Sequence, residues 1–367
     1  MGLHYLKMIK KIILIFTIFK ALKKCFKRVK KSILDSRYFF DVTFKNPSNI
    51  KISNSSNIER GSLFLVNDPI SNEEKNIIVG DNCWIGKDVE VQTHYSTKVI
   101  VSDYASVQSG CKLLGSVSIG KYSILAPDIF ISSGNHYYNS NPFLTIREQD
   151  AIESSTSEGF LNNNKPVVIE EDCWIGKNVF IKRGTYIGRG AIIGTNCIVT
   201  KDIEPYTINV GSPMGKIKDR IDFNPPQNIS AFELHHLPYF YRGFEHYSPN
   251  ENIADLVTQN HGIASEESSL VVLKQLEGKD VFIRGFAATS GQLNIYINGT
   301  LCLKKQLVRA SDFEFNIKSD DFGDSTILKD YNLLPLFIKK YHCVQFEFIC
   351  EDENKKYNFS ISEVAMT

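Results

Sequence analysis

The sequence predicts a mainly β chain, with a parallel β-coil of three-sided turns in its middle and a small antiparallel β-sandwich after it. Two observations carry this prediction. Aliphatic residues recur at every sixth position across residues 101–131 and again across residues 169–199. Short segments of alternating apolar and polar residues follow from about residue 270. A fixed short period indicates stacked repeats that each bury an apolar residue, and alternation indicates strands with one buried face.

The six-residue period also predicts the shape of the coil, because three hexads make one three-sided turn and each run then amounts to two turns. The periodic aliphatic residues are Val101, Val107, Leu113, Ile119, Leu125 and Ile131, then Ile169, Ile175, Ile181, Ile187, Ile193 and Val199. The residue four places after the aliphatic one is small or β-branched, as at Ala105, Cys111, Ser123, Cys173, Thr185, Ala191 and Cys197. Stacked parallel strands lie about 4.7–4.9 Å apart, which leaves little room inside.

Earlier segments extend the same pattern toward the N-terminus. Val79, Ile85 and Val91 add a turn, and a fainter series at Ile52, Ile58 and Phe64 adds another. The segments DNCWIGKDV (81–89) and EDCWIGKNV (171–179) are near-duplicates, so the period is not a chance pattern. We expect the glycines of WIGK, TYIGRG and AIIGTN to occupy tight corners that need a positive φ.

Across roughly residues 75–220 the chain resembles the left-handed parallel β-helix acyltransferases of the hexapeptide-repeat family. The left hand is what the resemblance implies, since ordinary crossover rules favour the other hand. The segment LAPDIFISSGNHYYN (125–139) is similar to the part of galactoside, maltose and streptogramin-type acetyltransferases that ends in their catalytic histidine, which here is His136. An irregular loop (137–166) and the closing motif VGSPMGKIK (210–218) follow in the family's order.

The resemblance implies an acetyl-CoA-dependent O-acetyltransferase that acts on a hydroxyl of a sugar or of a bacterial surface polysaccharide, such as capsule or lipopolysaccharide. His136 is expected to be the general base: a neutral imidazole removes the hydroxyl proton as attack proceeds, which is worth about 10² to 10⁴ in rate. The oxyanion that forms needs a hydrogen-bond donor. The resemblance places Trp174 on that side of the site. It implies direct transfer in a ternary complex, without a triad.

Five residues are carried over as contacts of coenzyme A. Lys177 and Thr195 would border the pantetheine arm, Thr200 and Lys201 would lie near the nucleotide, and Lys218 would offer a cation in the closing motif. For the lysines, simple exposure to solvent on the coil surface is an equally good interpretation. The family commonly forms homotrimers in which adjacent coils share each site, so Lys218 is a candidate to serve a neighbouring subunit.

The N-terminal segment differs in charge from the rest of the chain. The first 34 residues contain ten Lys and Arg and no acidic residue, while the whole chain carries a formal charge of +1. The apolar part of this segment is too short to span a bilayer, and it lacks a signal-peptide cleavage site. We predict an amphipathic helix (1–38) that lies on an anionic inner membrane, with the rest of the chain cytoplasmic. Packing on the coil or on another subunit is the alternative, and co-sedimentation with anionic vesicles distinguishes the two. Nucleic acid is not an expected partner.

The cysteines and histidines bear on redox state and metal binding. Four of the eight cysteines, Cys83, Cys111, Cys173 and Cys197, fill inward positions of the coil, which predicts buried thiols rather than disulfides. No metal is expected, because the spacing CxxC is absent and the coil offers only His94 and His136 where a metal-dependent hydratase needs three histidines. We interpret His94 as a structural or surface residue and Trp84 as a packing residue.

We place the coil domain at 40–222, with loop 137–166 extruded from it, and an accessory sandwich-like domain at 228–367. Strands are expected at SLVVLKQL, DVFIRGFA, QLNIYING, VQFEFICED and YNFSIS. The aromatic residues between coil and sandwich are candidates either to stack on sugar rings or to pack between domains: Tyr239, Phe240, Tyr241, Phe244 and Tyr247.

Two other functions stay open from the sequence. Similar coils N-acetylate amino sugar nucleotides, although the basic N-terminal segment and the extra domain fit that reaction less well. The coil could also serve a non-catalytic, glycan-binding trimer. Tight coenzyme A binding without turnover on any acceptor would favour this last reading.

Overall fold

The computed structural model describes residues 41–245, 263–276, 278–321, 334–350 and 359–367. These residues divide into two compact units, one of residues 41–118 and 124–166 and one of residues 119–123 and 167–367. The predicted helix at 1–38 lies outside the described residues and stays a prediction. Within the described part, no helix is long and apolar enough to cross a membrane.

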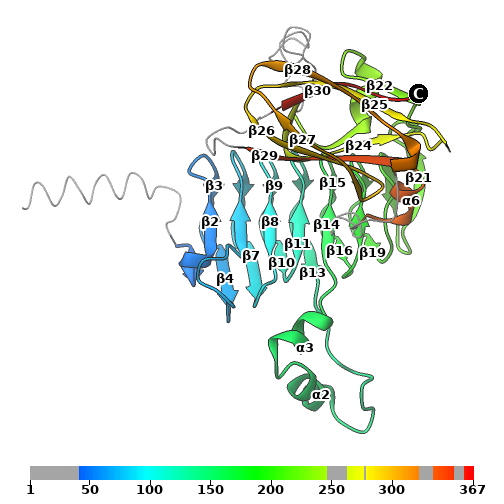
Figure 1. Cartoon of the computed structure of the whole chain (residues 1–367). Coiled ribbons are helices and arrows are strands. Elements are labelled where there is room, and N and C mark those ends of the chain that lie inside the picture. Colours follow the sequence, from blue (N-terminus) through cyan, green and yellow to red (C-terminus); the bar gives the residue numbers. More distant parts are fainter. Residues whose placement is uncertain (1–40, 246–262, 277, 322–333, 351–358) are drawn as a thin grey trace, which may run out of the picture. The chain divides into compact units, whose positions relative to one another are not determined.

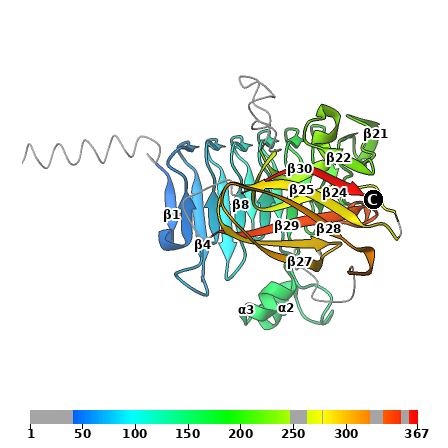
Figure 2. The ribbon, with the colours of Figure 1, turned by 45° about the horizontal axis from the view of Figure 1, so that its top comes forward.

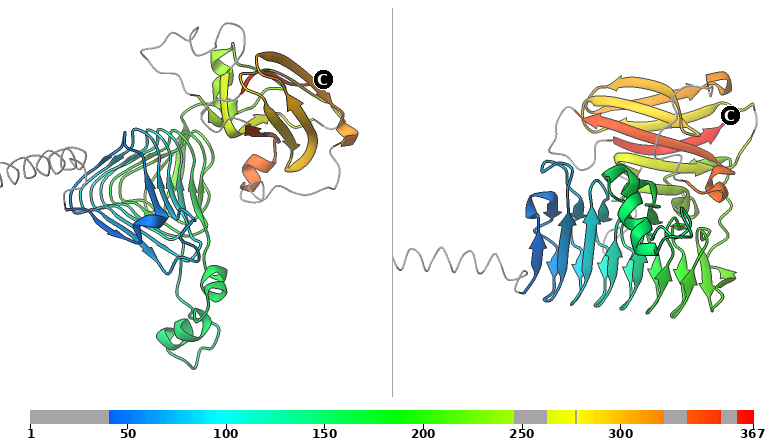
Figure 3. Two further views of the ribbon diagram at one scale, coloured as in Figure 1. Left: turned by 60° about the vertical axis from the view of Figure 1, so that its left-hand side comes forward. Right: turned by 90° about the horizontal axis from the view of Figure 1, so that it is seen from below.

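The first unit is a stack of short parallel strands on three faces (Figure 1). One face holds β1 (Thr43–Lys45), β4 (Leu63–Asn67), β7 (Glu90–His94), β10 (Lys112–Leu114) and β13 (Phe130–Ser132) in that order. The second holds β2 (Ile50–Ile52), β5 (Ile77–Val79) and β8 (Val99–Val101), with β11 (Val117–Ile119) at the unit boundary. The third holds β3 (Asn57–Ile58), β6 (Trp84–Ile85), β9 (Ser106–Val107) and β12 (Ile124–Leu125). Figure 3, left, shows these strands as three sides of a triangle.

The second unit continues the same construction in its first part. It holds β14 (Val167–Ile169), β15 (Trp174–Ile175), β16 (Phe180–Ile181), β17 (Tyr186–Ile187), β18 (Ile192–Ile193), β19 (Ile198–Val199) and β20 (Thr207–Val210). Trp174 pairs with Ile192 and Phe180 with Ile198, so each turn takes eighteen residues. The antiparallel β21 (Gly215–Asp219) lies beside β20 and ends the stack. The fold is a left-handed parallel β-helix, as predicted.

The interior of the β-helix matches the prediction residue by residue. All twelve periodic aliphatic residues are buried, and so are the seven small residues four places after them. Of the fainter early series, Ile58 and Phe64 are buried and Ile52 is half-buried. The four inward cysteines are buried free thiols. Burial raises the pKa of Cys111 to about 11, as expected for a thiol away from water.

The prediction about glycine corners is largely wrong, for a steric reason. Among the glycines of the three motifs only Gly190 has a positive φ, at 68°. At Gly86 and Gly176 a Cβ would lie 2.6 Å from the backbone nitrogen of the next turn, Ser109 N and Thr195 N respectively. These glycines are therefore needed because the turns approach closely. The left-handed corners are taken mainly by other residues, at Asn82, Asp88, Tyr104, Tyr122, Asp128, Asp172, Asn178 and Asn196.

The last part of the second unit is an antiparallel sheet that folds over into a sandwich (Figure 2). Its strands are β22 (Asn228–Ser230), β23 (Phe240–Phe244), β24 (Ile263–Leu273), β25 (Val281–Ala287), β26 (Gly291–Ile297), β27 (Thr300–Leu307), β28 (Ser311–Ile317), β29 (His342–Cys350) and β30 (Phe359–Met366). The strand order is β27-β26-β29-β24-β30-β25-β28, with β22 beside β30 and β23 beside β24. The short helices η2 (Leu234–Tyr239), η4 (Ser319–Asp321) and α6 (Leu336–Lys339) connect strands. All five predicted strands are present, and β22, β23, β27 and β28 are additional.

The aromatic segment before the sandwich packs inside it. Tyr239, Phe240 and Phe244 are buried in the sandwich core. Tyr241 is buried against Tyr186 of the β-helix. The sugar-stacking hypothesis is therefore wrong for these four residues, because their rings are not accessible; Tyr247 lies outside the described residues.

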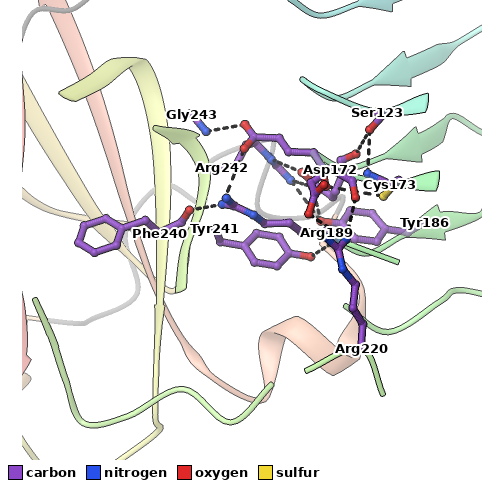
Figure 4. Close-up of polar contacts among 12 residues, drawn as sticks. Ser123, Asp172, Cys173, Tyr186, Arg189, Arg220, Phe240, Tyr241, Arg242 and Gly243 are labelled. Carbon is purple, nitrogen blue, oxygen red and sulfur yellow. Dashed lines mark hydrogen bonds and ion pairs between the residues drawn. The ribbon is translucent and has the colours of Figure 1, made fainter. Parts of the chain in front are cut away.

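A buried group of charges joins β23 to the β-helix turn within the second unit (Figure 4). Glu170 and Glu171 are each 3% exposed, although carboxylates are rarely buried without partners. The Arg242 guanidinium donates to Glu170 through two nitrogens, and Tyr186 donates its hydroxyl to the same carboxylate. The backbone N–H of Gly243 donates to Glu171 at 2.9 Å. Arg189 donates in return to the carbonyl of Phe240.

These contacts make β23 part of the β-helix's own packing. Burial and the Glu170 charge together raise the pKa of Tyr186 well above its ordinary value, so its hydroxyl stays a donor. Burial works to lower the pKa of Arg242, but the Glu170 carboxylate raises it by more than burial lowers it. The guanidinium therefore stays charged. The Arg242 side chain is 32% exposed, whereas that of Glu170 is 3% exposed, so removing Arg242 leaves a buried carboxylate without its cation.

We predict that Arg242→Met lowers the free energy of unfolding by about 3–5 kcal/mol, because Glu170 is then buried without its cation. Arg284→Met is the matched control. Arg284 also contacts two carboxylates, but Glu314 and Glu363 are 58% and 30% exposed, against 3% for Glu170. Its loss should cost at most about 1 kcal/mol. Urea unfolding followed by circular dichroism measures both, and equal losses would contradict the assignment.

Candidate active site

An arm leaves the β-helix after β13 and returns at β14 (Figure 1). By its position three residues after Ser133, His136 lies at the neck of this arm. The N–H of Lys165 donates to the carbonyl of Ser133 at 2.8 Å, and the side chains of Ser133 and Asn164 are hydrogen-bonded. Asn163 donates to the carbonyl of Asn135 at 2.6 Å. The two ends of the arm are thus bonded to each other immediately beside His136.

The arm is more regular than the sequence suggested. It contains α2 (Ile146–Glu153) and α3 (Ser157–Asn162). Thr145 caps α2, because its hydroxyl accepts from the N–H of Glu148 while the Glu148 carboxylate accepts from the N–H of Thr145. The ring of Phe160 on α3 packs on His94, with centroids 5.2 Å apart. His94 is half-buried in this contact, and burial lowers its pKa, which fits a structural role.

Helix α2 carries a carboxylate to the imidazole. Oδ2 of Asp150 lies 2.6 Å from Nδ1 of His136, and Oδ1 accepts from the N–H of Tyr137 at 2.7 Å. Partial burial works to raise the pKa of Asp150, but the Tyr137 N–H and the His136 ring outweigh it and hold the pKa below its usual value of 3.8. An ionised carboxylate only accepts hydrogen bonds, so Nδ1 carries the proton.

This arrangement prepares His136 to take up a proton. With Nδ1–H bonded to Asp150, Nε2 is the ring's acceptor, and the side chain is 78% exposed. A carboxylate that holds the imidazole in one tautomer also stabilises the imidazolium that forms. Sequence reasoning left open which acid, if any, orients His136; the structure gives Asp150. The capping-box spacing of Thr145 and Glu148 was the available signal, because it predicts where α2 begins.

Trp174 and the five expected coenzyme A contacts belong to the second unit, whereas His136 belongs to the first. The Trp174 side chain points outward and is 54% exposed. Its backbone N–H donates to the carbonyl of Ala191 at 3.0 Å, and the N–H of Cys173 donates to Ser123. Both backbone N–H groups already donate to acceptors inside the β-helix. The donor that Trp174 can offer an oxyanion is therefore its indole N–H.

The structure brings two of the five expected contacts together. Lys177 and Thr195 lie at the same corner of successive turns, where the N–H of Asn196 donates to the carbonyl of Lys177. Thr200 and Lys201 follow β19 on the surface, and Lys218 is exposed on β21. Their roles toward coenzyme A stay predictions. Among the described residues, no cluster of three or more His, Cys, Asp or Glu side chains could hold a metal ion.

Comparison with known proteins bears on the turns that hold Trp174 and Lys177. Residues 166–201 match the family model described as bacterial transferase hexapeptide (six repeats). The chain carries a hexapeptide-repeat transferase domain. The matched segment spans the second predicted run of hexads, from Ile169 to Val199.

Named relatives of the hexapeptide-repeat domain are acetyltransferases. The protein named as colanic acid biosynthesis acetyltransferase WcaF of Escherichia coli K12 is 28% identical over 144 residues, which cover 38% of this chain and 70% of WcaF. A chloramphenicol acetyltransferase of Klebsiella aerogenes is 36% identical over 128 residues, covering 34% of this chain and 52% of that protein. The chain is thus similar to acetyltransferases over its hexapeptide-repeat part.

A solved structure of AntD, an N-acyltransferase from Bacillus cereus, is 18% identical with a TM-score of 0.34, covering 52% of this chain and 89% of that chain.

We predict that the amide resonances of Tyr137 titrate together with the Asp150 carboxyl, with a midpoint below pH 3.8. A depressed folded-state pKa means that the carboxylate contacts stabilise the arm above that value and are lost as the pH falls through it. NMR of the Tyr137 amide between about pH 2 and 7 measures this. A midpoint above the ordinary Asp value would contradict the Asp150 contacts.

Proposed function

We propose that the protein is an O-acetyltransferase that moves an acetyl group from acetyl-CoA to a hydroxyl of a sugar or bacterial surface polysaccharide. The observation that carries the proposal is the His136–Asp150 pair at the neck of the arm, with Nδ1 held at 2.6 Å and the ring exposed. Similarity to WcaF, whose name refers to the biosynthesis of the polysaccharide colanic acid, supports a glycan as acceptor.

The proposed reaction runs in one ternary complex. The acceptor hydroxyl oxygen attacks the thioester carbonyl while Nε2 of His136 takes the hydroxyl proton. Asp150 stabilises the imidazolium through Nδ1–H. The oxyanion-side role of Trp174, which belongs to the second unit, stays a prediction from the resemblance. The C–S bond then breaks, and the imidazolium returns its proton to the leaving thiolate. The products are an acetyl ester and the free thiol of coenzyme A.

The residues proposed to hold coenzyme A agree chemically with its parts. Lys177 and Thr195 meet at one corner, where backbone and hydroxyl groups suit the amides of the pantetheine arm. Lys201 and Lys218 are exposed cations that suit phosphate groups. The homotrimer, the inner-membrane contact and the cytoplasmic location expected from the sequence stay predictions.

N-acetylation of an amino sugar nucleotide is the alternative reaction. An amine is a stronger nucleophile than a hydroxyl once it has lost its proton, and the same imidazole could serve it. The two products differ in stability, because mild alkali hydrolyses an acetyl ester and leaves an acetamide intact. The linkage therefore decides between the two reactions directly.

We predict that the purified protein releases free thiol from acetyl-CoA in the presence of bacterial polysaccharides, and that the acetyl group it transfers is removed by mild alkali. His136→Ala should lower kcat at least about a hundredfold, because the general base is lost. His235→Ala is the control, since His235 is also well exposed but lies in η2. A wild-type rate for His136→Ala would remove the general-base assignment, and an alkali-stable product would favour N-acetylation.

We predict that Asp150→Asn lowers kcat about ten- to a hundredfold while leaving KM for acetyl-CoA unchanged. An amide in place of the carboxylate can donate to Nδ1 and so favour the tautomer that carries its proton on Nε2. Glu158→Gln, which removes an exposed carboxylate from the same arm, should leave kcat unchanged. Equal effects of the two substitutions on kcat would show that the carboxylate does not position His136.

A further inference from the structure

The peptide units on both sides of His136 are held by side chains from the two helices of the arm. On the C-terminal side, Oδ1 of Asp150 on α2 accepts from the N–H of Tyr137 at 2.7 Å. On the N-terminal side, Nδ2 of Asn163, the residue that follows α3, donates to the carbonyl of Asn135 at 2.6 Å. We propose that Asn163 is a positioning residue for acetyl transfer and acts on His136 through this peptide unit. The inference rests on the proposed function and adds a residue to it.

The carbonyl of Asn135 belongs to the peptide unit that ends at the nitrogen of His136. A peptide unit is planar, so a hydrogen bond to its oxygen also restrains its nitrogen. With the following unit held by Asp150, both backbone dihedral angles of His136 are restrained, and these angles decide the direction in which the imidazole leaves the chain. Because a carbonyl oxygen only accepts hydrogen bonds, the Asn163 atom that faces it has to be the amide nitrogen.

Helix α3 gives Asn163 a fixed base on the β-helix. The Phe160 ring packs on the rings of His94 and Tyr95 at the end of β7, with centroids 5.2 Å apart in each case. The N–H of Asn163 donates to the carbonyl of Phe160 at 3.3 Å, so the last turn of α3 connects the packed ring to the amide. Asn163 therefore links the backbone at His136 to the body of the β-helix without involving α2.

The two helices of the arm also contact each other where α3 begins. A Cβ at Gly159 would lie 1.8 Å from the carbonyl oxygen of Glu153, the last residue of α2, so a side chain has no room at this crossing. The Tyr137 hydroxyl donates to the carbonyl of Gly159 at 2.6 Å. The two groups that hold His136 therefore come from one packed pair of helices.

Asp150 and Asn163 act on different parts of His136. The carboxylate fixes the tautomer of the ring and stabilises its charge, whereas the Asn163 amide is uncharged and holds the backbone before the ring. Losing the amide should therefore leave the basicity of the imidazole unchanged and let Nε2 move away from the acceptor hydroxyl. A displacement of about 1 Å in a catalytic group can cost about a hundredfold in rate.

Steady-state kinetics of Asn163→Ala with acetyl-CoA and a polysaccharide acceptor tests this role. We expect kcat to fall about tenfold with the KM for acetyl-CoA and the pH dependence of kcat unchanged, because the base is misplaced but chemically the same. Asn162→Ala is the matched control, since Asn162 is the exposed neighbour at the end of α3, and it should keep the wild-type kcat. A wild-type kcat for Asn163→Ala, or an equal loss in both variants, would overturn the inference.

The same substitution in a His136→Ala background separates positioning from general damage to the arm. Asn163→Ala should not lower the residual rate of that variant further, since no imidazole is left to be positioned. A further tenfold loss in this background would give Asn163 a purely structural role and overturn the inference.

NMR of the His136 amide provides a measurement that needs no activity. The hydrogen bond from Asn163 polarises the Asn135 carbonyl and so deshields the nitrogen of His136 in the same peptide unit. Asn163→Ala should shift the His136 amide nitrogen resonance upfield, and Asn162→Ala should leave it in place. If the wild type transfers no acetyl group, the proposed function fails, and this resonance still decides whether Asn163 holds the peptide unit. An unmoved resonance in Asn163→Ala would overturn the inference.

Discussion

Each turn of the β-helix has to fit under the next at the spacing of hydrogen-bonded strands, and this constraint decides most of the sequence from Ile58 to Val199. This spacing constraint is strictest at the corners between strands. The backbone of Thr195 lies so close to Gly176 that even a methyl group would meet its nitrogen at 2.6 Å. In most hexads the interior holds one aliphatic residue and one small or β-branched residue four places later, and both are buried. Such a wall has no room for a reactive side chain inside it, so chemistry has to be placed where the wall is interrupted.

The arm after β13 is that interruption, and its architecture explains why a histidine there can act as a base. Capping by Thr145 and Glu148 fixes where α2 begins, and α2 in turn carries Asp150 to the imidazole. The same carboxylate binds the N–H of Tyr137, so one side chain fixes both His136 and the backbone that follows it. A single helix start therefore determines the orientation of the candidate base.

The repetitive part of the fold could be predicted because each hexad obeys the same local rule. Every periodic aliphatic residue proved to be buried, and alternation at Leu293, Ile295 and Ile297 gave a true strand. Features that depend on a neighbour far along the chain could not be predicted in this way. Gly176 is required because Thr195 of the next turn lies close to it, not because of its own φ. Tyr241 is buried because it packs in one cluster with Tyr186. At the candidate site, the resemblance points to His136, while the partnership with Asp150 appears only once α2 is in place.

The buried charges at Glu170 and Glu171 link the sandwich to the turns that carry Trp174 and Lys177 within one unit. Arg242 and the Gly243 N–H hold β23, and β23 pairs with β24, which pairs with β29. Glu170 and Glu171 come only a few residues before Trp174, so the packing of β23 also fixes the start of the turn that carries Trp174 and Lys177. The sandwich therefore contributes to the candidate site by holding this turn of the β-helix in place, through buried charges that lose their partners if β23 leaves.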